Sequence, residues 1–270
     1  MKNLLALILL IPLYAVSVTA QSYDTTDWQN PAVFGKGQVA PRAFHVPYDD
    51  IGGALSGGTE ASPYEVSLNG RWAFSWYSSP LEVPADFFDI HHDASSWDSI
   101  VVPSHWQMEG YGHPKFRNVA LSFDAEPPRV PVDDNPTGCY RRSFRIPSTW
   151  EGRQIFLRFE GVKSASYVWV NGQMAGYNQG GFEPAEYDVT PWVKEGENEL
   201  AVQVLRFCDG SYLENQDMWR LSGIFRNVRL YAQPEVHIHD FYHTTDLDDD
   251  YRDAILHVEA DHRNDGTEVA

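Results

Sequence analysis

The strongest constraint in this sequence is a two-residue hydrophobic period that begins near Ser67 and continues through most of the chain. Large apolar side chains occupy every second position in successive short runs, which include Trp72, Phe74 and Trp76; Ile155, Leu157 and Phe159; and Leu200, Val202 and Val204. Because side chains on a β-strand point alternately to opposite faces, this period indicates strands with one buried face. No run of a dozen residues has a helical period, so the sequence predicts an all-β sandwich of the jelly-roll type.

Turn signals separate the expected strands. Asn171-Gly172 follows an apolar run, and this pair tolerates the positive φ angles of a type I′ turn, so a hairpin is predicted there. Turns at 135–138 and 195–198 precede expected strands at 139–146 and 199–207. Two more strands are expected at 236–242 and 255–260, after a boundary near Gln233 and Pro234.

The first twenty residues have the features of a processing segment. Lys2 supplies a positive start, an apolar run extends from Leu4 to Val16, and small residues precede a cut after Ala20. The apolar run is short for a membrane span. We therefore expect a signal peptide (residues 1–20) that is cleaved rather than kept as an anchor, and a secreted or periplasmic protein.

The rest of the chain divides into three expected parts. Residues 21–65 are rich in Gly, Pro, Asp and Ser and predict an extended arm, whose aromatic side chains dock on the same chain or on a neighbour in a homo-oligomer. Residues 66–232 hold the expected sandwich. Residues 233–270 number only 38, against about 100 in an immunoglobulin-like sandwich, so they predict an incomplete domain of that kind with exposed strands.

Charge and cysteine content exclude several classes of function. The chain has 20 Lys and Arg against 38 Asp and Glu, a net charge of −18, which repels nucleic acid and anionic membranes at long range. Cys139 and Cys208 are too few for a disulfide framework, and they predict two buried thiols or one bridge. No Cys and His spacing is typical of a zinc site.

Six sequence blocks, in this order and spacing, resemble the N-terminal domain of β-galactosidases in glycoside hydrolase family two. The blocks are 27–31 (DWQNP), 67–72 (SLNGRW), 101–108 (VVPSHWQM), 110–111 (GY), 135–140 (NPTGCY) and 209–226 (DGSYLENQDMWRLSGIFR). The similarity covers roughly residues 26–245. It implies a sugar-binding jelly roll followed by an immunoglobulin-like domain, and then a (β/α)₈ barrel that carries two catalytic glutamates.

The resemblance also implies two residues that bind the substrate. Asp209 matches an aspartate that contacts galactose and helps to ligate a sodium ion, and Asn118 matches an asparagine that lines the same pocket. A carboxylate accepts hydrogen bonds from sugar hydroxyls, and an amide both donates and accepts them. The family also binds Mg²⁺, through ligands that belong to the barrel.

No catalytic residue is expected in this chain. A barrel needs about 250 residues, and only 38 follow Ala232. Retaining hydrolysis needs two carboxyl groups about 5–5.5 Å apart on a rigid scaffold. Glu160 and Glu186 are available, but we expect each to lie on a solvated sheet face or in a turn.

One loop departs from the family pattern. Relatives usually carry a small and a basic residue before the segment 184–186, whereas Gly181 and Phe182 stand there in this chain. Phe182 cannot bridge carboxylates or a sugar, so the role of this loop in relatives is not carried over to this chain. The polar residues 214–217 predict either a self-satisfied loop or a surface facing the barrel, and Trp219 predicts packing at the domain junction or sugar stacking.

Three functions remain open on the sequence. The first is the sugar-binding part of a β-galactosidase, inactive by itself, whose parent enzyme releases terminal β-D-galactose with retention. The second is a stand-alone, non-catalytic carbohydrate-binding module, and the third is a structural or interaction fragment. The last two need no catalytic barrel.

Overall fold

The computed structural model describes residues 26–58, 62–117, 120–214 and 216–266. The expected signal peptide lies outside the described residues. The strands are β1 Gly35–Lys36, β2 Glu65–Ser67, β3 Gly70–Tyr77, β4 Asp98–Val102, β5 Lys115–Arg117, β6 Thr137–Ile146, β7 Gln154–Phe159, β8 Val162–Lys163, β9 Ala165–Val170, β10 Gln173–Gln179, β11 Ala185–Asp188, β12 Gly196–Leu205, β13 Met218–Arg220, β14 Gly223–Ile224, β15 Val228–Gln233, β16 Val236–Leu247 and β17 Ala254–Asn264. The described helices are short: α1 Ile51–Ser56 and the 3₁₀ turns η1 Asp27–Gln29, η3 Pro80–Glu82, η4 Trp106–Glu109, η5 Ser148–Trp150 and η6 Asp209–Tyr212.

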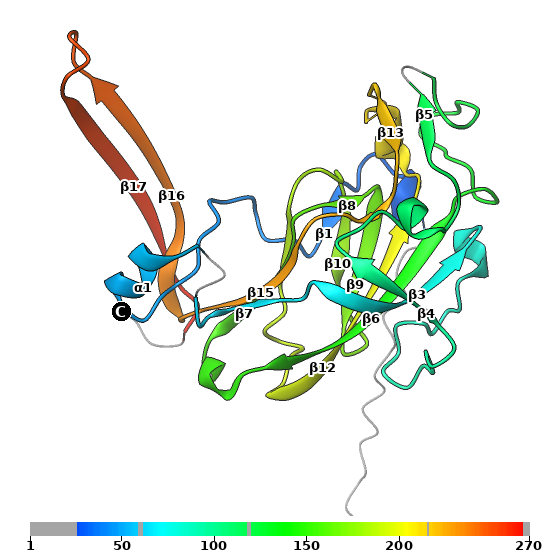
Figure 1. The fold of residues 1–270 in the computed structure, drawn as a ribbon, viewed down its shortest axis with the longest axis horizontal. Helices are drawn as coiled ribbons and strands as arrows, with labels where there is room; N and C mark the ends of the chain where they lie inside the picture. The colour runs from blue at the N-terminus through cyan, green and yellow to red at the C-terminus, as the bar shows by residue number, and fades with distance from the viewer. Residues whose placement is uncertain (1–25, 59–61, 118–119, 215, 267–270) are drawn as a thin grey trace, which may run out of the picture.

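Two antiparallel sheets pack face to face as a sandwich (Figure 1). Seven strands form one sheet in the order β1-β10-β9-β12-β6-β3-β4, and four form the other in the order β11-β7-β15-β2. The predicted all-β sandwich is confirmed. The apolar positions of the two-residue period lie between the sheets, where Trp72, Phe74, Leu157, Val202 and Leu230 belong to one buried cluster.

The expectation of one buried face is wrong for the middle of the larger sheet. Every residue of β9 is buried, and a second cluster on the outer face holds Tyr167, Trp169 and Tyr177. Side chains from irregular segments cover this face: Phe87 meets the Trp169 ring edge-on at 5.2 Å, and Trp28 of the arm belongs to the same cluster. These covering segments have no hydrophobic period, so the period alone could not reveal them.

The predicted hairpin at Asn171-Gly172 is confirmed. These two residues join β9 to β10 with φ angles of 50° and 78°, as a type I′ turn requires. The Asn171 side chain also accepts from the Glu199 backbone at 2.9 Å, which ties the turn to β12. The predicted turn at 195–198 is too long, because β12 already begins at Gly196.

The arm packs along its own sandwich. Its strand β1 pairs with β10, and Gln38 forms an isolated bridge with Tyr187. Further along, Val46 is buried with Phe156 and Tyr231 of the smaller sheet. The described part of the arm therefore docks on its own chain, which was the first of the two expected alternatives.

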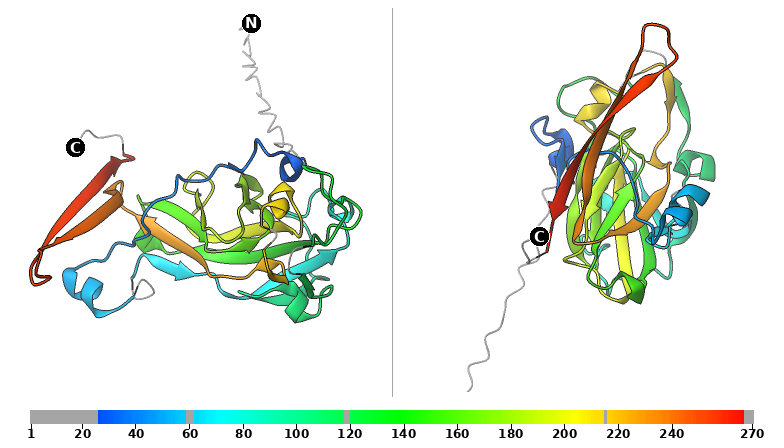
Figure 2. Two further views of the ribbon diagram at one scale, coloured as in Figure 1. Left: turned by 90° about the horizontal axis from the view of Figure 1, so that it is seen from above. Right: turned by 90° about the vertical axis from the view of Figure 1, so that its left-hand side faces the viewer.

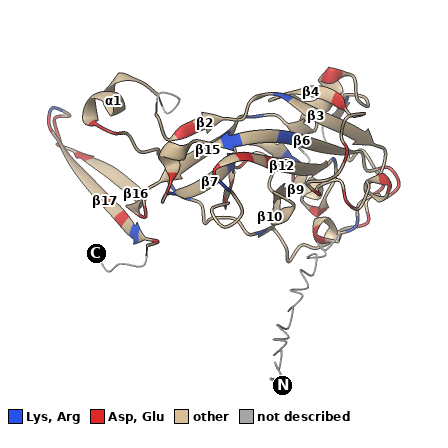
Figure 3. Cartoon of the chain, turned by 90° about the horizontal axis from the view of Figure 1, so that it is seen from below, with Lys and Arg blue, Asp and Glu red and all other residues tan. Residues whose placement is uncertain are grey.

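A buried ionic cluster around Glu186 holds the arm against the sandwich. The expectation that Glu186 lies on a solvated face or in a turn is therefore wrong. Arg42 of the arm binds Glu186 Oε1 through Nη2 at 2.8 Å, while Arg158 reaches Oε2 at 3.2 Å. Figure 3 shows that several Lys and Arg lie in the strands of the sandwich, whereas Asp and Glu are mostly in loops and at strand ends. Glu160 is also paired, with Arg229 at 3.0 Å, but keeps about a quarter of its side chain exposed.

The last two strands form a separate hairpin that projects from one end of the sandwich (Figure 2). Nearly all of β16 and β17 is exposed, including Tyr242, Leu256 and Val258. The arm contacts the base of this hairpin. Arg42 Nη1 lies 2.9 Å from His239 Nδ1, and the Ala43 backbone N–H donates to Asp240 Oδ1 at 2.8 Å. The two predicted strands are confirmed; the domain boundary near Gln233 and Pro234 stays a prediction.

In the part of the chain that the structure describes, no helix is long and apolar enough to cross a membrane.

We predict that Glu186→Gln destabilises the fold strongly. The change leaves two guanidinium groups buried without their shared carboxylate, and breaking a buried pair in this way costs about 3–5 kcal/mol. Glu160→Gln is the matched control, because its partly exposed pair with Arg229 is worth about 1 kcal/mol or less. Urea unfolding followed by tryptophan fluorescence measures both, and equal losses for the two variants would contradict the assignment.

The projecting hairpin is predicted to open faster than the sandwich, and more so in acid. Burial and the Arg42 charge lower the pKa of His239, and burial lowers that of His237, so both rings stay neutral when folded. The stability they contribute is therefore present above the ordinary histidine pKa of 6.5 and is lost as the pH falls below it. Hydrogen exchange at about pH 7.5 and about pH 5.5, corrected for intrinsic rates, tests this. Protection of β16 and β17 equal to that of β9 and β12 at both pH values would show it to be wrong.

Candidate functional site

Asp209 stands where the central strand β12 leaves the sheet and turns into η6. The Asn135 side chain fixes this exit, because its amide donates to the Phe207 carbonyl at 3.0 Å and accepts from the Phe207 N–H at 2.8 Å. The Asn135 side chain, two residues before β6 begins, therefore pairs with Phe207 in the way a further backbone partner would. The η6 turn begins with the Cys208 N–H donating to Ser211 Oγ at 3.1 Å. The backbone at Asp209 is thus held from two sides.

The Asp209 carboxylate is buried and only partly satisfied. Its side chain is 8% exposed, and Oδ1 has no hydrogen-bond partner among the described residues. Burial raises the pKa of Asp209 above its ordinary value, with the Gln179 amide and the Gly210 backbone acting against this rise. A buried acceptor without a partner costs free energy, which a hydrogen-bond donor placed beside it would recover.

The other predicted substrate residue, Asn118, lies outside the described residues. The strand that leads to this position, β5 (Lys115–Arg117), is described, and it pairs antiparallel with β13 (Met218–Arg220). This pairing joins the strand that leads to position 118 to the block that begins at Asp209, and Figure 1 shows the two strands side by side. Trp219 and Phe116 face each other across the pair, 54–57% exposed, with ring centroids 5.6 Å apart. Trp219 is therefore on the surface of this chain.

The loop after η6, which carries Glu214, contacts the loop of Gly181 and Phe182, where the sequence departs from the family pattern. Glu214 Oε1 accepts from the Gly181 N–H at 3.1 Å, whereas Oε2 has no partner among the described residues. Burial raises the pKa of Glu214, and the Lys163 charge opposes that rise. The loop is thus partly self-satisfied and keeps one acceptor available.

Lys163 brings a positive charge to this loop. Its ammonium lies 4.5 Å from the centre of the Phe182 ring, a cation–π contact, and 3.5 Å from the Met218 sulfur. Lys163 sits on the short strand β8, and its side chain is buried. The loop therefore lacks a basic residue of its own but has a cation against its aromatic ring. The sequence did not reveal this, because the two residues are on different elements.

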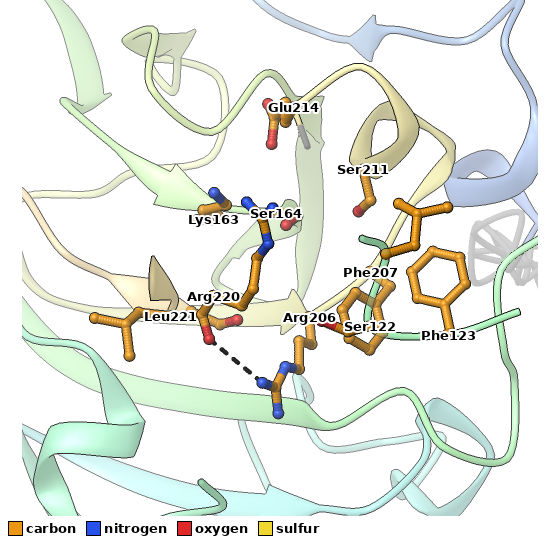
Figure 4. A pocket seen from close by; sticks show the side chains of 12 residues that line it. Ser122, Phe123, Lys163, Ser164, Arg206, Phe207, Ser211, Glu214, Arg220 and Leu221 are labelled. Carbon is orange, nitrogen blue, oxygen red and sulfur yellow. Dashed lines mark hydrogen bonds between the residues drawn. The ribbon is translucent and has the colours of Figure 1, made fainter. Parts of the chain in front are cut away.

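A small cavity lies behind these residues (Figure 4). It is lined by Leu121, Ser122, Phe123, Lys163, Ser164, Arg206, Phe207, Ser211, Glu214, Arg220, Leu221 and Ser222. Its volume of about 30 Å³ is far below the roughly 300–1,000 Å³ of ordinary small-molecule pockets, so it does not fit a whole sugar ring. Asp209 is outside this lining, and a sugar that meets Asp209 would lie elsewhere.

Asp209 is the one residue of this chain for which the sequence predicts a metal contact. Among the described residues, no group of three or more His, Cys, Asp or Glu side chains could hold an ion. The free Oδ1 of Asp209 fits a single hard oxygen ligand of the kind that sodium takes. The remaining ligands would have to come from other groups.

The two cysteines are buried free thiols, which decides between the two expectations for them. Burial raises the pKa of Cys208 to about 12, and the nearby Glu214 and Asp209 charges add to this. Such a thiol is protonated at neutral pH and unreactive.

Two site residues escaped the sequence analysis. Asn135 was interpreted as part of a turn, although its place in a block shared with the family was a signal. Lys163 gave no signal, because a lysine next to apolar Val162 in a strand is most often exposed.

Comparisons with known proteins identify the region that holds these residues. Residues 66–234 match the family model described as glycosyl hydrolases family 2, sugar binding domain. A β-galactosidase of Priestia megaterium is 42% identical over 248 residues, covering 90% of this chain and 24% of that protein. A β-galactosidase of Alteromonas mediterranea is 43% identical over 246 residues, covering 90% of this chain and 23% of that protein.

Solved structures support the fold. A Bifidobacterium dentium β-glucuronidase superposes with a TM-score of 0.59 at 22% identity, over 76% of this chain and 37% of that one. An uncultured Clostridium β-glucuronidase gives 0.56 at 24%, over 74% and 34%. The chain spans about a quarter of the length of the curated relatives it matches. With most of its sandwich inside the matched residues, the chain belongs to the sugar-binding domain family of family 2 glycosyl hydrolases.

Proposed function

We propose that this chain is the sugar-binding domain of a β-galactosidase and that Asp209 offers a hydrogen-bond acceptor to the galactosyl group. The observation that carries this is the buried Oδ1 of Asp209, which has no partner among the described residues. Asp209 opens the longest block shared with the family, and the two relatives at 42–43% identity are named β-galactosidase. Asn118 is proposed as the second sugar contact from the resemblance alone.

The chemistry of hydrolysis is assigned to other parts of the parent enzyme. Retaining cleavage of a terminal β-D-galactoside needs one carboxylate as nucleophile and one carboxylic acid as proton donor. Glu186 is locked between Arg42 and Arg158, and Glu160 is paired with Arg229. A carboxylate whose oxygens are engaged by arginine donors is tied up in an ion pair and does not face a substrate. Neither residue is therefore proposed as catalytic.

Asp209 is also proposed as one ligand of a sodium ion completed by the rest of the parent enzyme. Such an ion would orient sugar hydroxyls near the carboxylate. Mg²⁺, implied by the family, is assigned to ligands outside this chain. Export with cleavage after Ala20, and subunit contacts through the arm in a homo-oligomer, are proposals from the sequence alone.

The first test is activity. The purified chain is expected to release no product from a chromogenic β-galactoside above the buffer rate, because Glu186 and Glu160 are engaged by arginines and the catalytic glutamates are assigned to other parts of the parent enzyme. A preparation from the same host that lacks the chain sets the background. Turnover that copurifies with the folded chain would refute the proposal.

The second test is binding. Galactose is expected to shift the backbone amide resonances of Gly210 and Ser211 with weak affinity, since a single polar anchor leaves the site shallow and wet. Asp209→Asn should weaken this binding by roughly tenfold, because hydrogen bonds to charged groups are worth about 1.5–3 kcal/mol.

Asp217→Asn is the matched control, on the exposed part of the same loop. Galactose binding that is equally strong in the Asp209 variant and in the control would remove Asp209 from the site. Tight binding by the unmodified chain would favour the alternative of an independent carbohydrate-binding module.

A further inference from the structure

A larger pocket lies on the outer face of the larger sheet, where the end of β12 and the start of β9 are covered by the arm and by the η3 turn. Its volume is about 260 Å³, close to the lower limit of roughly 300–1,000 Å³ for ordinary small-molecule sites. Its walls include Trp28 of the arm, Leu81 of η3, Tyr167 of β9 and Gln203 of β12. Asp209 is outside this lining, so the pocket is separate from the proposed galactose contact.

Gln203 places an amide in this wall. Its neighbours Ala201 and Leu205 belong to the cluster on the outer face. Val202 and Val204 belong to the cluster between the sheets, so the Gln203 side chain points outward, toward the pocket. Gln203 is 3% exposed, and its Oε1 is buried with no hydrogen-bond partner among the described residues. An acceptor in this state costs free energy, which a ligand that donates a hydrogen bond would recover.

The charge of the pocket limits what it can bind. None of its nine lining residues is charged, although the whole chain has a net charge of −18. An ionised ligand would lose its water here without gaining a counter-charge, which is strongly unfavourable. The lining therefore selects a neutral ligand.

Two aromatic rings supply most of the apolar contact. Trp28 and Tyr167 line the pocket from the arm and from the sheet, and Leu81, which is 73% exposed, lies at its mouth. A pyranose ring has an apolar C–H face that packs against aromatic rings, and it has hydroxyls at its edge that donate to an amide oxygen. A neutral hexose therefore meets both requirements of the lining.

Hydrogen bonds hold the covering segments, so the pocket is formed before a ligand binds. Ser79 Oγ donates to the Val132 carbonyl at 2.8 Å and accepts from the Leu81 N–H at 3.1 Å. Gln29 Oε1 accepts from the Val130 N–H at 3.2 Å, which ties the arm to the segment that carries Val132. A site whose walls are already fixed loses less entropy on binding.

We propose that this pocket is a second sugar site, in which Gln203 Oε1 accepts a hydrogen bond from a neutral hexose that packs against Trp28 and Tyr167. The proposal does not rest on the assignment of Asp209. It gives the domain two separate contacts for carbohydrate, both near the end of β12.

The test is an NMR titration of the purified Asp209→Asn chain with galactose and with glucose. The Gln203 side-chain amide and the Trp28 indole N–H should shift together and saturate with the same weak affinity, because one ring contacts both. Galacturonate at neutral pH should leave both resonances in place, since its carboxylate would meet an uncharged wall.

Three further changes in this background make the assignment specific. Gln203→Met removes the amide at similar length, so it should weaken binding, read at Trp28, by about fivefold, while Tm stays equal or rises because the unsatisfied acceptor is gone. Leu81→Ala, at an exposed residue, should weaken binding by about two- to fivefold through lost apolar contact. Gln173→Met, at an exposed position of β10, is the matched control and should leave the affinity unchanged.

Each result decides for or against the second site. Gln203 and Trp28 resonances that do not respond to either hexose would overturn the proposal. So would an affinity that is unchanged in Gln203→Met, or one that is equal for galacturonate. Because these readouts come from a chain that lacks the Asp209 carboxylate, their failure leaves the assignment of Asp209 untouched. Loss of the galactose response at Gly210 in the unmodified chain likewise leaves this pocket untouched.

Discussion

Burial of the middle of the larger sheet on both faces is the constraint on which the rest of the structure depends. Strand β9 is buried along its whole length, and β12 is buried from Leu200 to Leu205. No ligand can reach the middle of such a sheet, so chemistry is confined to the strand ends. Asp209 follows the end of β12, and Asn135 pins this exit through both hydrogen bonds to Phe207. A rigid core thus presents one carboxylate in a fixed position.

The buried carboxylates of the fold differ in how fully their oxygens are hydrogen-bonded. Glu186 is satisfied by Arg42 and Arg158, which ties the arm to the sandwich and removes this carboxylate from any reaction. Asp209 and Glu214, by contrast, each keep an oxygen with no partner among the described residues. Both oxygens of Glu186 are thus engaged by arginine, while Asp209 and Glu214 each keep an unused acceptor. This division is the physical basis for placing ligand contacts at one end of the sandwich.

The sequence predicted what depends on local pattern. The two-residue period identified the inner face, and Asn171-Gly172 predicted its turn, because both signals are carried by neighbouring residues. The outer cover of the sheet was missed, since Phe87 and Trp28 lie in segments without a period. Glu186 was misjudged because Arg42 is 144 positions away in the chain. Lys163 meets Phe182 only through the fold. Long-range partners of buried charges were therefore the part that could not be predicted.

The central claim is that Asp209 holds a buried, incompletely satisfied carboxylate that sugar hydroxyls can reach. Carbon-13 NMR titration of the aspartate carboxyl groups tests it most directly. Asp209 should titrate above the ordinary aspartate pKa, whereas Asp93, whose pKa is lowered by hydrogen bonds from Ser95, serves as a reference below it. Galactose should lower the pKa of Asp209 alone, because hydroxyl donors favour its charged form. An Asp209 carboxyl that titrates like a solvated aspartate and does not respond to galactose would contradict the account.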